Sequence, residues 1–199
     1  MEFLHRAPGV PLHVGILPGA FNPVTVAHLA LAQACLNRVD EVVFVLPRTF
    51  PHKDVDGAGL EERADLLVAL ADGSEALSVA RTDGGLFIEI ARECRAAYGG
   101  GVDMSILCGR DAAERIVRWD YGAPGAIDGM LQEFHLLVAA RRGEYMPPPR
   151  LSHAIARLEL DGEFDHVSAS EVRRLVASGG SWEHLVPAAL RDQVRRLYR

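Results

Sequence analysis

A turn and a helix start near the N-terminus carry residue types that bind phosphate. Residues 18–23 (PGAFNP) are expected to form a tight turn, and Thr25 and His28 stand at the start of the helix expected after it. A helix N-terminus offers unpaired backbone N–H groups and the positive end of its dipole to an anion. Thr25 at the cap and His28 in the first turn can both donate hydrogen bonds to a phosphate. The spacing fits equally well an ordinary turn with a threonine cap and a histidine packed against a sheet.

A cationic segment follows the next apolar run. Residues 47–53 (PRTFPHK) contain Arg48, His52 and Lys53. Such a cluster at the end of a strand suits a polyanionic substrate, whereas charges in a loop are more commonly only solvated. Lys53 is the single lysine among 21 basic residues, so the one compact, rotatable ammonium of the chain lies here. This favours a role in binding phosphate.

Three later segments also place polar groups directly after apolar runs or at a helix start. Gly109 allows a close approach of its backbone to a ligand, and Asp111 can cap a helix or accept a hydrogen bond from a ribose hydroxyl. Arg141 follows the next apolar run. Residues 168–173 (SASEVR) are typical of a capped helix start, which is the simpler local interpretation. The alternative is a second phosphate cradle made of hydroxyls, N–H groups and Arg173.

Apolar runs and helical patterns alternate along the chain, which positions these groups. The expected strands are 13–17, 41–46, 77–81, 102–108 and 135–140, and the expected helices are 26–37, 60–71, 86–98, 111–118, 168–178 and 187–198. This alternation predicts an α/β fold, a Rossmann-like open parallel sheet with helices on both faces. Ligands of such sheets bind beyond the carboxyl ends of the strands, where the groups above are expected.

The C-terminal quarter is expected to be an appendage of the same domain. Residues 146–149 (MPPP) predict an extended connector. From about residue 150 to residue 199 we expect a small helical part that carries the second phosphate motif. The whole chain, residues 1–199, is therefore predicted to be one domain.

Composition excludes several classes of protein. With 49% hydrophobic and 24% charged residues, the 199-residue chain is typical of a globular domain. Three cysteines without a C-x-x-C spacing indicate a reducing compartment, and no apolar run resembles a signal peptide or a membrane span, so we expect a cytoplasmic protein. A net charge of −6 gives no basic footprint for a nucleic-acid polymer or a membrane. The eight histidines are scattered, so no metal site is predicted, and no G-x-G-x-x-G follows the first strand.

Taken together and in order, the segments resemble the nucleotidyltransferase superfamily that carries the (H/T)xGH and ISSTxxR signatures. Within it they are most similar to the bacterial nicotinate-mononucleotide adenylyltransferases. The matching segments are 19–28 (GG(S/T)FNPxHxGH in the family), 47–53 (P…PHK), 109–119 (GADN…W), 138–145 (VxxRPGY), 167–173 (ISSTxIR) and the tail 185–198. No one segment is decisive, but the ordered set is specific and covers nearly the whole chain.

The resemblance implies adenylyl transfer from ATP to nicotinate or nicotinamide mononucleotide, with release of pyrophosphate, in NAD biosynthesis. It implies Mg²⁺ bound through the ATP phosphates and a reaction without a covalent intermediate. The implied partners are ATP and a mononucleotide. Whether the protein forms a homo-oligomer is left open. The implied catalytic residues are His28, Thr25, Lys53 and Arg173. The implied ATP and phosphate contacts are Gly19, Ala20, Phe21, Asn22, Gly109, Asp111, Ser168 and Ser170. The implied acceptor contacts are Trp119, which would stack on the ring, Arg110 and Arg141.

Departures from the family pattern leave the acceptor open. The departures are Pro18 for the first glycine, Ala20 for Ser/Thr, Thr25 for the first histidine, Ala27 for glycine, Arg110 for a small residue and Ala112 for asparagine. The family's SYTxDT segment, which helps to hold the pyridine nucleotide, is not recognisable in residues 84–90. Thr25 favours comparison with the phosphopantetheine branch, whereas the PHK segment and Trp119 favour a pyridine nucleotide. Cytidylyl transfer and a catalytically impaired nucleotide-binding homologue are the further alternatives.

Overall fold

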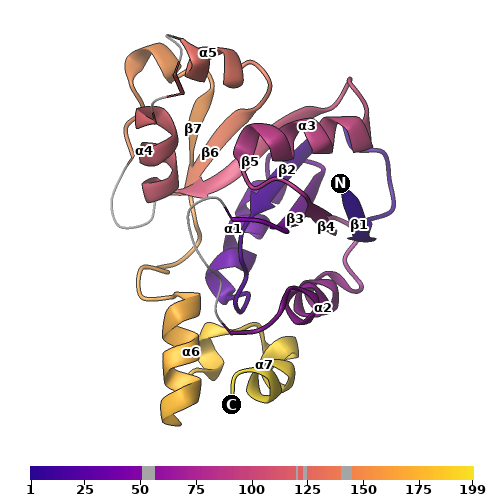
Figure 1. The fold of residues 1–199 in the computed structure, drawn as a ribbon, viewed down its shortest axis with the longest axis vertical. Coiled ribbons are helices and arrows are strands. Elements are labelled where there is room, and N and C mark those ends of the chain that lie inside the picture. Colours follow the sequence, from indigo (N-terminus) through magenta and orange to yellow (C-terminus); the bar gives the residue numbers. More distant parts are fainter. Residues whose placement is uncertain (51–56, 120, 123–124, 140–144) are drawn as a thin grey trace.

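Six of the seven strands in the described part of the chain run parallel in one sheet. The structure is a computed structural model, and it describes residues 1–50, 57–119, 121–122, 125–139 and 145–199. The strands are β1 (Glu2–His5), β2 (His13–Pro18), β3 (Glu41–Pro47), β4 (Leu77–Thr82), β5 (Asp103–Gly109), β6 (His135–Ala139) and β7 (Ile155–Leu158). Their order across the sheet is β1-β4-β3-β2-β5-β6-β7, and only the edge strand β1 is antiparallel to its neighbour (Figure 1).

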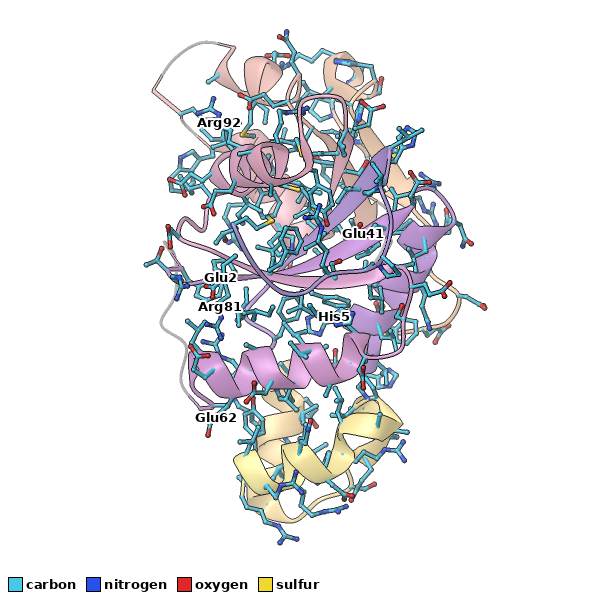
Figure 2. The ribbon with its side chains drawn as sticks, turned by 90° about the vertical axis from the view of Figure 1, so that its right-hand side faces the viewer. Glu2, His5, Glu41, Glu62, Arg81 and Arg92 are labelled. Carbon is cyan, nitrogen blue, oxygen red and sulfur yellow. The ribbon has the colours of Figure 1, made fainter. Side chains whose placement is uncertain are left out.

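Helices cover both faces of this sheet. They are α1 (Val26–Leu36), α2 (Leu60–Ala71), α3 (Phe87–Tyr98), α4 (Arg110–Arg118), α5 (Ala126–Met130), α6 (Ala169–Ser178) and α7 (Arg191–Leu197). The helices α1, α2, α6 and α7 share one apolar core with the sheet, and α3, α4 and α5 share a second core on the other face. Figure 2 shows Arg92 of α3 and Glu62 of α2 on opposite sides of the sheet. No helix in the described ranges is long and apolar enough to cross a membrane.

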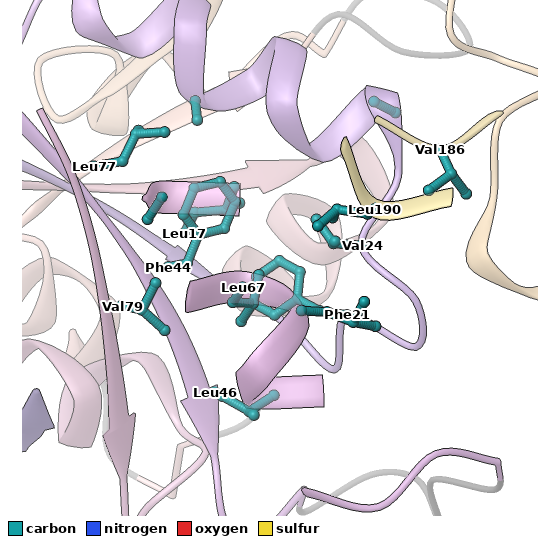
Figure 3. Close-up of a cluster of buried hydrophobic side chains, with 14 of the residues drawn as sticks. Leu17, Phe21, Val24, Phe44, Leu46, Leu67, Leu77, Val79, Val186 and Leu190 are labelled. Carbon is teal, nitrogen blue, oxygen red and sulfur yellow. The ribbon is translucent and has the colours of Figure 1, made fainter. Parts of the chain in front are cut away.

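The central strand β3 shows why its sequence forms a buried strand. All seven of its residues are buried, as expected for a nearly continuous apolar run in a parallel sheet. Successive side chains point to opposite faces, so Phe44 and Leu46 enter the first core whereas Val43 and Val45 enter the second. Figure 3 shows Phe44 and Leu46 among the buried side chains of the first core. Each core is therefore supplied by alternate residues of the same strand.

The strand order reverses at β2. From β2 the chain moves outward through β3 to β4, then returns to the other side of β2 as β5 and continues to β6 and β7. In open α/β sheets, ligands bind in the crevice beyond the carboxyl ends of the strands at such a reversal. Here those carboxyl ends are Pro18 of β2 and Gly109 of β5. The predicted phosphate turn and the predicted ribose-binding segment both start there.

The predicted α/β fold is confirmed, and the structure adds three elements. Strands β1 and β7 and the short helix α5 were not expected from the sequence. Strand β7 has only four residues, and the middle two are exposed, so it lacks a continuous apolar run. The sequence predicted a helical C-terminal part from about residue 150. That prediction was incomplete, because β7 lies in this part and belongs to the sheet. Its two predicted helices correspond to α6 and α7, although a 3₁₀ turn (Ala188–Leu190) precedes α7.

Candidate active site

The turn after β2 is held by buried contacts on both sides. The backbone N–H of Gly19 donates to the carbonyl of Val45 in β3 over 3.0 Å. Phe21 has a φ of 46°, in the left-handed region that residues other than glycine rarely adopt. Its buried ring contacts Phe44 edge-on and lies within 3 Å of the place where a Cβ on Gly19 would be (Figure 3). The adjacent core therefore constrains the conformation of the turn.

Thr25 and His28 interact directly at the start of α1. The backbone N–H of Thr25 donates to Nδ1 of His28 over 3.0 Å, and Oγ1 of Thr25 lies 2.9 Å from the same nitrogen. A backbone N–H is always a donor, so Nδ1 must be the accepting nitrogen and the proton of the neutral ring resides on Nε2. Thr25 is buried and His28 is half-buried. The cap thus sets the tautomer that can donate from Nε2 to a phosphate oxygen.

Arg173 comes to this turn from α6, 151 residues further along the chain. The helix starts at Ser168, whose hydroxyl accepts from the backbone N–H of Glu171 over 3.1 Å, as the capped-helix interpretation predicts. Nη1 of Arg173 donates to the carbonyl of Asn22 over 2.5 Å, and Nη2 lies 3.4 Å from the hydroxyl of Ser170. The structure therefore brings two predicted phosphate motifs together at the carboxyl end of β2.

Arg63 of α2 also supports the turn, and it was missed by sequence reasoning. Its side chain is buried, and Nη1 donates to the carbonyl of Ala20 over 2.7 Å. Its Nε donates to the carbonyls of Ala58 and Gly59 over 3.1 and 3.2 Å. Burial lowers the pKa of this guanidinium. Arg63 lies three and four residues before Leu66 and Leu67, and so on the apolar side of α2. This position in the sequence could have indicated that its side chain is buried.

The C-terminal residues reach the same turn. The hydroxyl of Tyr198 donates to Oδ1 of Asn22 over 2.6 Å, although 176 residues separate the two in sequence. Asn22 is itself buried. Burial raises the pKa of the Tyr198 hydroxyl, so Tyr198 remains a neutral donor at physiological pH. The side chain of Asn22 is thereby fixed from the C-terminal end of the chain.

The end of the loop after β3 also lies against Asn22. Gly57 has a φ of 105°, and a Cβ placed on it would lie 3.2 Å from Oδ1 of Asn22 and 3.4 Å from Cδ of Arg173. This close approach needs glycine, because a side chain would be both crowded and strained. Residues 51–56 lie outside the described residues, so the predicted role of Lys53 stays a prediction.

The segment after β5 forms the start of α4. Gly109 is the N-cap residue of that helix, and Asp111 lies in its first turn. Nε of Arg110 donates to Oε1 of Glu114 over 2.7 Å. Arg110 and Tyr145 line one cavity of about 270 Å³.

A different, larger cavity lies beside Trp119 at the end of α4. Its volume is about 610 Å³, and Trp119 is 51% exposed. The apolar lining includes Leu86, Phe87, Ile88, Ile116, Trp119 and Met130. Residues 85–88 form one wall, although they lack the family's sequence pattern. Arg110 does not line this cavity, so Trp119 and Arg110, two of the three predicted acceptor contacts, do not share a cavity. The third, Arg141, lies outside the described residues.

The donors at the turn suit phosphate oxygens better than a metal ion. His28, Arg173 and the start of α1 all present N–H groups, which a cation does not bind. Within the described part of the chain, no three side chains of histidine, cysteine, aspartate or glutamate are grouped so as to hold a metal ion. A magnesium ion carried by the phosphates themselves is compatible with these residues, because Mg²⁺ commonly binds phosphate oxygens and water with few protein ligands.

Residues 16–175, from β2 into α6, match the family model described as Cytidylyltransferase-like. The chain belongs to this cytidylyltransferase-like family. Its matched range contains both the turn after β2 and Arg173, the two parts that meet in the structure. The predicted resemblance to the nucleotidyltransferases is therefore confirmed.

Individual proteins resemble the chain over nearly its whole length. The probable nicotinate-nucleotide adenylyltransferase of Geobacter sp. (strain M21) is 32% identical to it, with 94% of this chain and 98% of that protein covered. The protein of the same name from Rubrobacter xylanophilus is 28% identical over 94% and 92% of the two chains. Among solved structures, the Plasmodium falciparum nicotinic acid mononucleotide adenylyltransferase complexed with NaAD has a TM-score of 0.67 at 16% identity, covering 92% of this chain and 95% of that one. This last likeness shows that the fold is shared.

Proposed function

We propose that this protein is an enzyme that transfers the adenylyl group of ATP to nicotinate mononucleotide, releasing pyrophosphate, in NAD biosynthesis. Relatives named nicotinate-nucleotide adenylyltransferase that match over nearly their full lengths support this activity. The observation that carries it in the structure is the hydrogen bond from Arg173 to the carbonyl of Asn22, in the turn that leads into the Thr25–His28 cap at the reversal of the strand order. That place suits the phosphates of two nucleotides.

The proposed reaction needs positioning more than covalent chemistry. An oxygen of the mononucleotide phosphate attacks the α-phosphorus of ATP; the new P–O bond forms as the bond to pyrophosphate breaks, and pyrophosphate leaves with the electron pair. Nε2 of His28 donates to an oxygen of the transferring phosphoryl group, and Arg173 balances the negative charge of the phosphates. Thr25 orients the His28 ring through its backbone N–H.

The remaining predicted residues keep their proposed places around ATP. Residues 19–22 would surround the phosphates, Ser168 and Ser170 would add hydroxyl donors, and Lys53 would hold further phosphate charge. Gly109 and Asp111, at the end of β5, would hold the ribose of ATP. Mg²⁺ bound through the phosphates would neutralise part of their charge. We assign the acceptor ring to the cavity beside Trp119, because a planar aromatic side chain in the lining suits stacking on a planar ring.

Release of pyrophosphate with a set of acceptors tests this proposal. The protein is supplied with ATP and Mg²⁺, and with nicotinate mononucleotide, nicotinamide mononucleotide or phosphopantetheine. We expect release with a pyridine mononucleotide. Release with phosphopantetheine only would keep the mechanism and discard the acceptor. ATP binding without release in any mixture would favour the catalytically impaired alternative, to which Pro18, Ala20 and Ala27 point.

A further inference from the structure

The cavity beside Trp119 has charged groups set in its apolar lining. These are the guanidinium groups of Arg92 and Arg115 and the carboxylate of Glu133; Tyr121 adds a neutral hydroxyl. Tyr121 donates to the backbone carbonyl of Ile116 over 3.0 Å. A ligand in this cavity therefore meets two positive charges and one negative charge besides the apolar walls.

Arg92 and Glu133 neutralise each other. Nη2 of Arg92 donates to Oε1 of Glu133 over 2.7 Å, and Nε lies 3.2 and 3.3 Å from the two carboxylate oxygens. This two-pronged geometry is the strong form of an arginine–carboxylate pair. The hydrogen bond from Arg92 also lowers the pKa of Glu133, so both partners are charged at neutral pH. Figure 2 shows Arg92 on the side of the sheet that α3 covers.

Arg115 has no such partner. Within the described residues it makes no hydrogen bond or ion pair with another side chain, and it lies on α4 one turn before Trp119. The side chains that line the cavity consequently carry one positive charge that is not held in an ion pair within the described residues. An exposed arginine one turn from a half-exposed tryptophan suits a ligand that is both planar and anionic.

The position of the phosphates decides which end of the ligand meets Arg115. Under the proposed function, the acceptor phosphate must reach His28 to attack ATP. None of the residues from Gly19 to His28 lines the cavity. The phosphate end therefore lies outside the cavity and the ring end lies inside it, so Arg115 faces the substituent on the ring.

We propose that Arg115 is a specificity-determining residue that selects an acceptor with a negatively charged ring substituent, so that the acid form of the mononucleotide binds in preference to the amide form. This inference rests on the proposed function for the identity of the acceptor. A carboxylate on the ring accepts charge-assisted hydrogen bonds from the guanidinium, whereas a neutral carboxamide gains less. Because Arg115 is exposed to solvent, the preference it supplies is about five- to tenfold in Kd.

Equilibrium binding tests the inference independently of catalysis. Calorimetric titration gives the Kd of nicotinate mononucleotide and of nicotinamide mononucleotide for the wild type, for Arg115→Gln and for Arg118→Gln. Arg118 is the matched control, because it is an exposed arginine on the same helix that does not line this cavity. It borders a neighbouring hollow of about 330 Å³ and the smaller cavity beside Arg110. We expect Arg115→Gln to reduce the preference for the acid about five- to tenfold, Arg118→Gln to leave it unchanged, and Arg115→Lys to restore part of it.

Two results would overturn the inference. One is an unchanged preference in Arg115→Gln; the other is an equal loss of affinity for both mononucleotides, which would place Arg115 on the shared phosphate. Pyrophosphate release by the wild type is measured alongside. If the acid preference depends on Arg115 but no pyrophosphate is released, the binding inference stands and the proposed function fails.

Discussion

At the scale of single residues, Arg63 is a buried cation that hydrogen-bonds only to main-chain carbonyls in the described structure. Its contacts join the turn after β2, at Ala20, to the start of α2, at Ala58 and Gly59. Burying a guanidinium costs free energy that hydrogen bonds to its donors must offset, and the carbonyls in turn depend on it. Arg63 is therefore a positioning residue for the phosphate turn rather than a group that touches substrate.

Replacing Arg63 by methionine should destabilise the fold. Methionine fills much of the space, but it leaves the carbonyls of Ala20, Ala58 and Gly59 without their donor. We expect the free energy of unfolding to fall by about 2–4 kcal/mol, as measured by urea denaturation. Arg174→Met is the control on an exposed helix surface, and it should change stability by less than about 1 kcal/mol. A similarly small effect of Arg63→Met would contradict this role.

The role of a residue could be predicted from the sequence where its partner lies within a few residues of it. Thr25 and His28 lie three residues apart, and the structure joins them as a cap and its partner. The contacts of Arg63 and Tyr198 could not be predicted in the same way. Two carbonyl partners of Arg63 are local, but the third, that of Ala20, lies 43 residues away. The partner of Tyr198 lies 176 residues away, so only the tertiary fold brings these distant groups together.

At the scale of elements, Gly15 sets how closely α1 packs on β2. A Cβ added to Gly15 would lie 2.7 Å from Sγ of Cys35 in α1 and 3.1 Å from Cγ2 of Val42 in β3. Both neighbours are fully buried, so neither can move into solvent. Thr25 caps the N-terminus of the same helix, so the packing of α1 on β2 also helps to position the phosphate motif.

Gly15→Ala should therefore cost about 1–3 kcal/mol of stability through overpacking. Combining it with Cys35→Ala, which removes the nearest atom, should cost less than the sum of the two single substitutions. A double-mutant cycle in urea measures this coupling, which we expect to be about 1 kcal/mol. Strict additivity would show that the two residues do not meet as the structure has them.

The elements that could be predicted are those with a continuous apolar run or a helical apolar pattern. Residues 41–46 and 60–71 were expected as a strand and a helix, and the structure has β3 and α2 there. Strands β1 and β7 were missed because each has only four residues at an edge of the sheet, with too few buried positions to show a period. Helix α5 has five residues, little more than one turn, and it follows a stretch rich in glycine and proline.

At the scale of the whole molecule, the three thiols report on the integrity of both cores. Cys35 lies in the first core, and Cys94 and Cys108 lie in the second. Burial raises the pKa of each thiol to about 12. Because the thiolate is the reactive form, the native protein holds almost none of it at pH 8.

A thiol reagent such as Ellman's reagent should consequently react slowly with the native protein at pH 8. All three thiols should react promptly once urea unfolds the chain. The rate of native labelling measures how often the cores open. Prompt reaction of a thiol in the folded protein would contradict the packing of the core in which it lies.

The most direct test of the account is the turnover of His28→Ala with ATP, Mg²⁺ and nicotinate mononucleotide. If Nε2 of His28 stabilises the transferring phosphoryl group, kcat should fall about 100- to 1,000-fold. The variant should stay folded and still bind ATP, because it loses a cap contact worth only about 1 kcal/mol. A folded His28→Ala protein with near-wild-type kcat would contradict the assignment of the reaction to this turn.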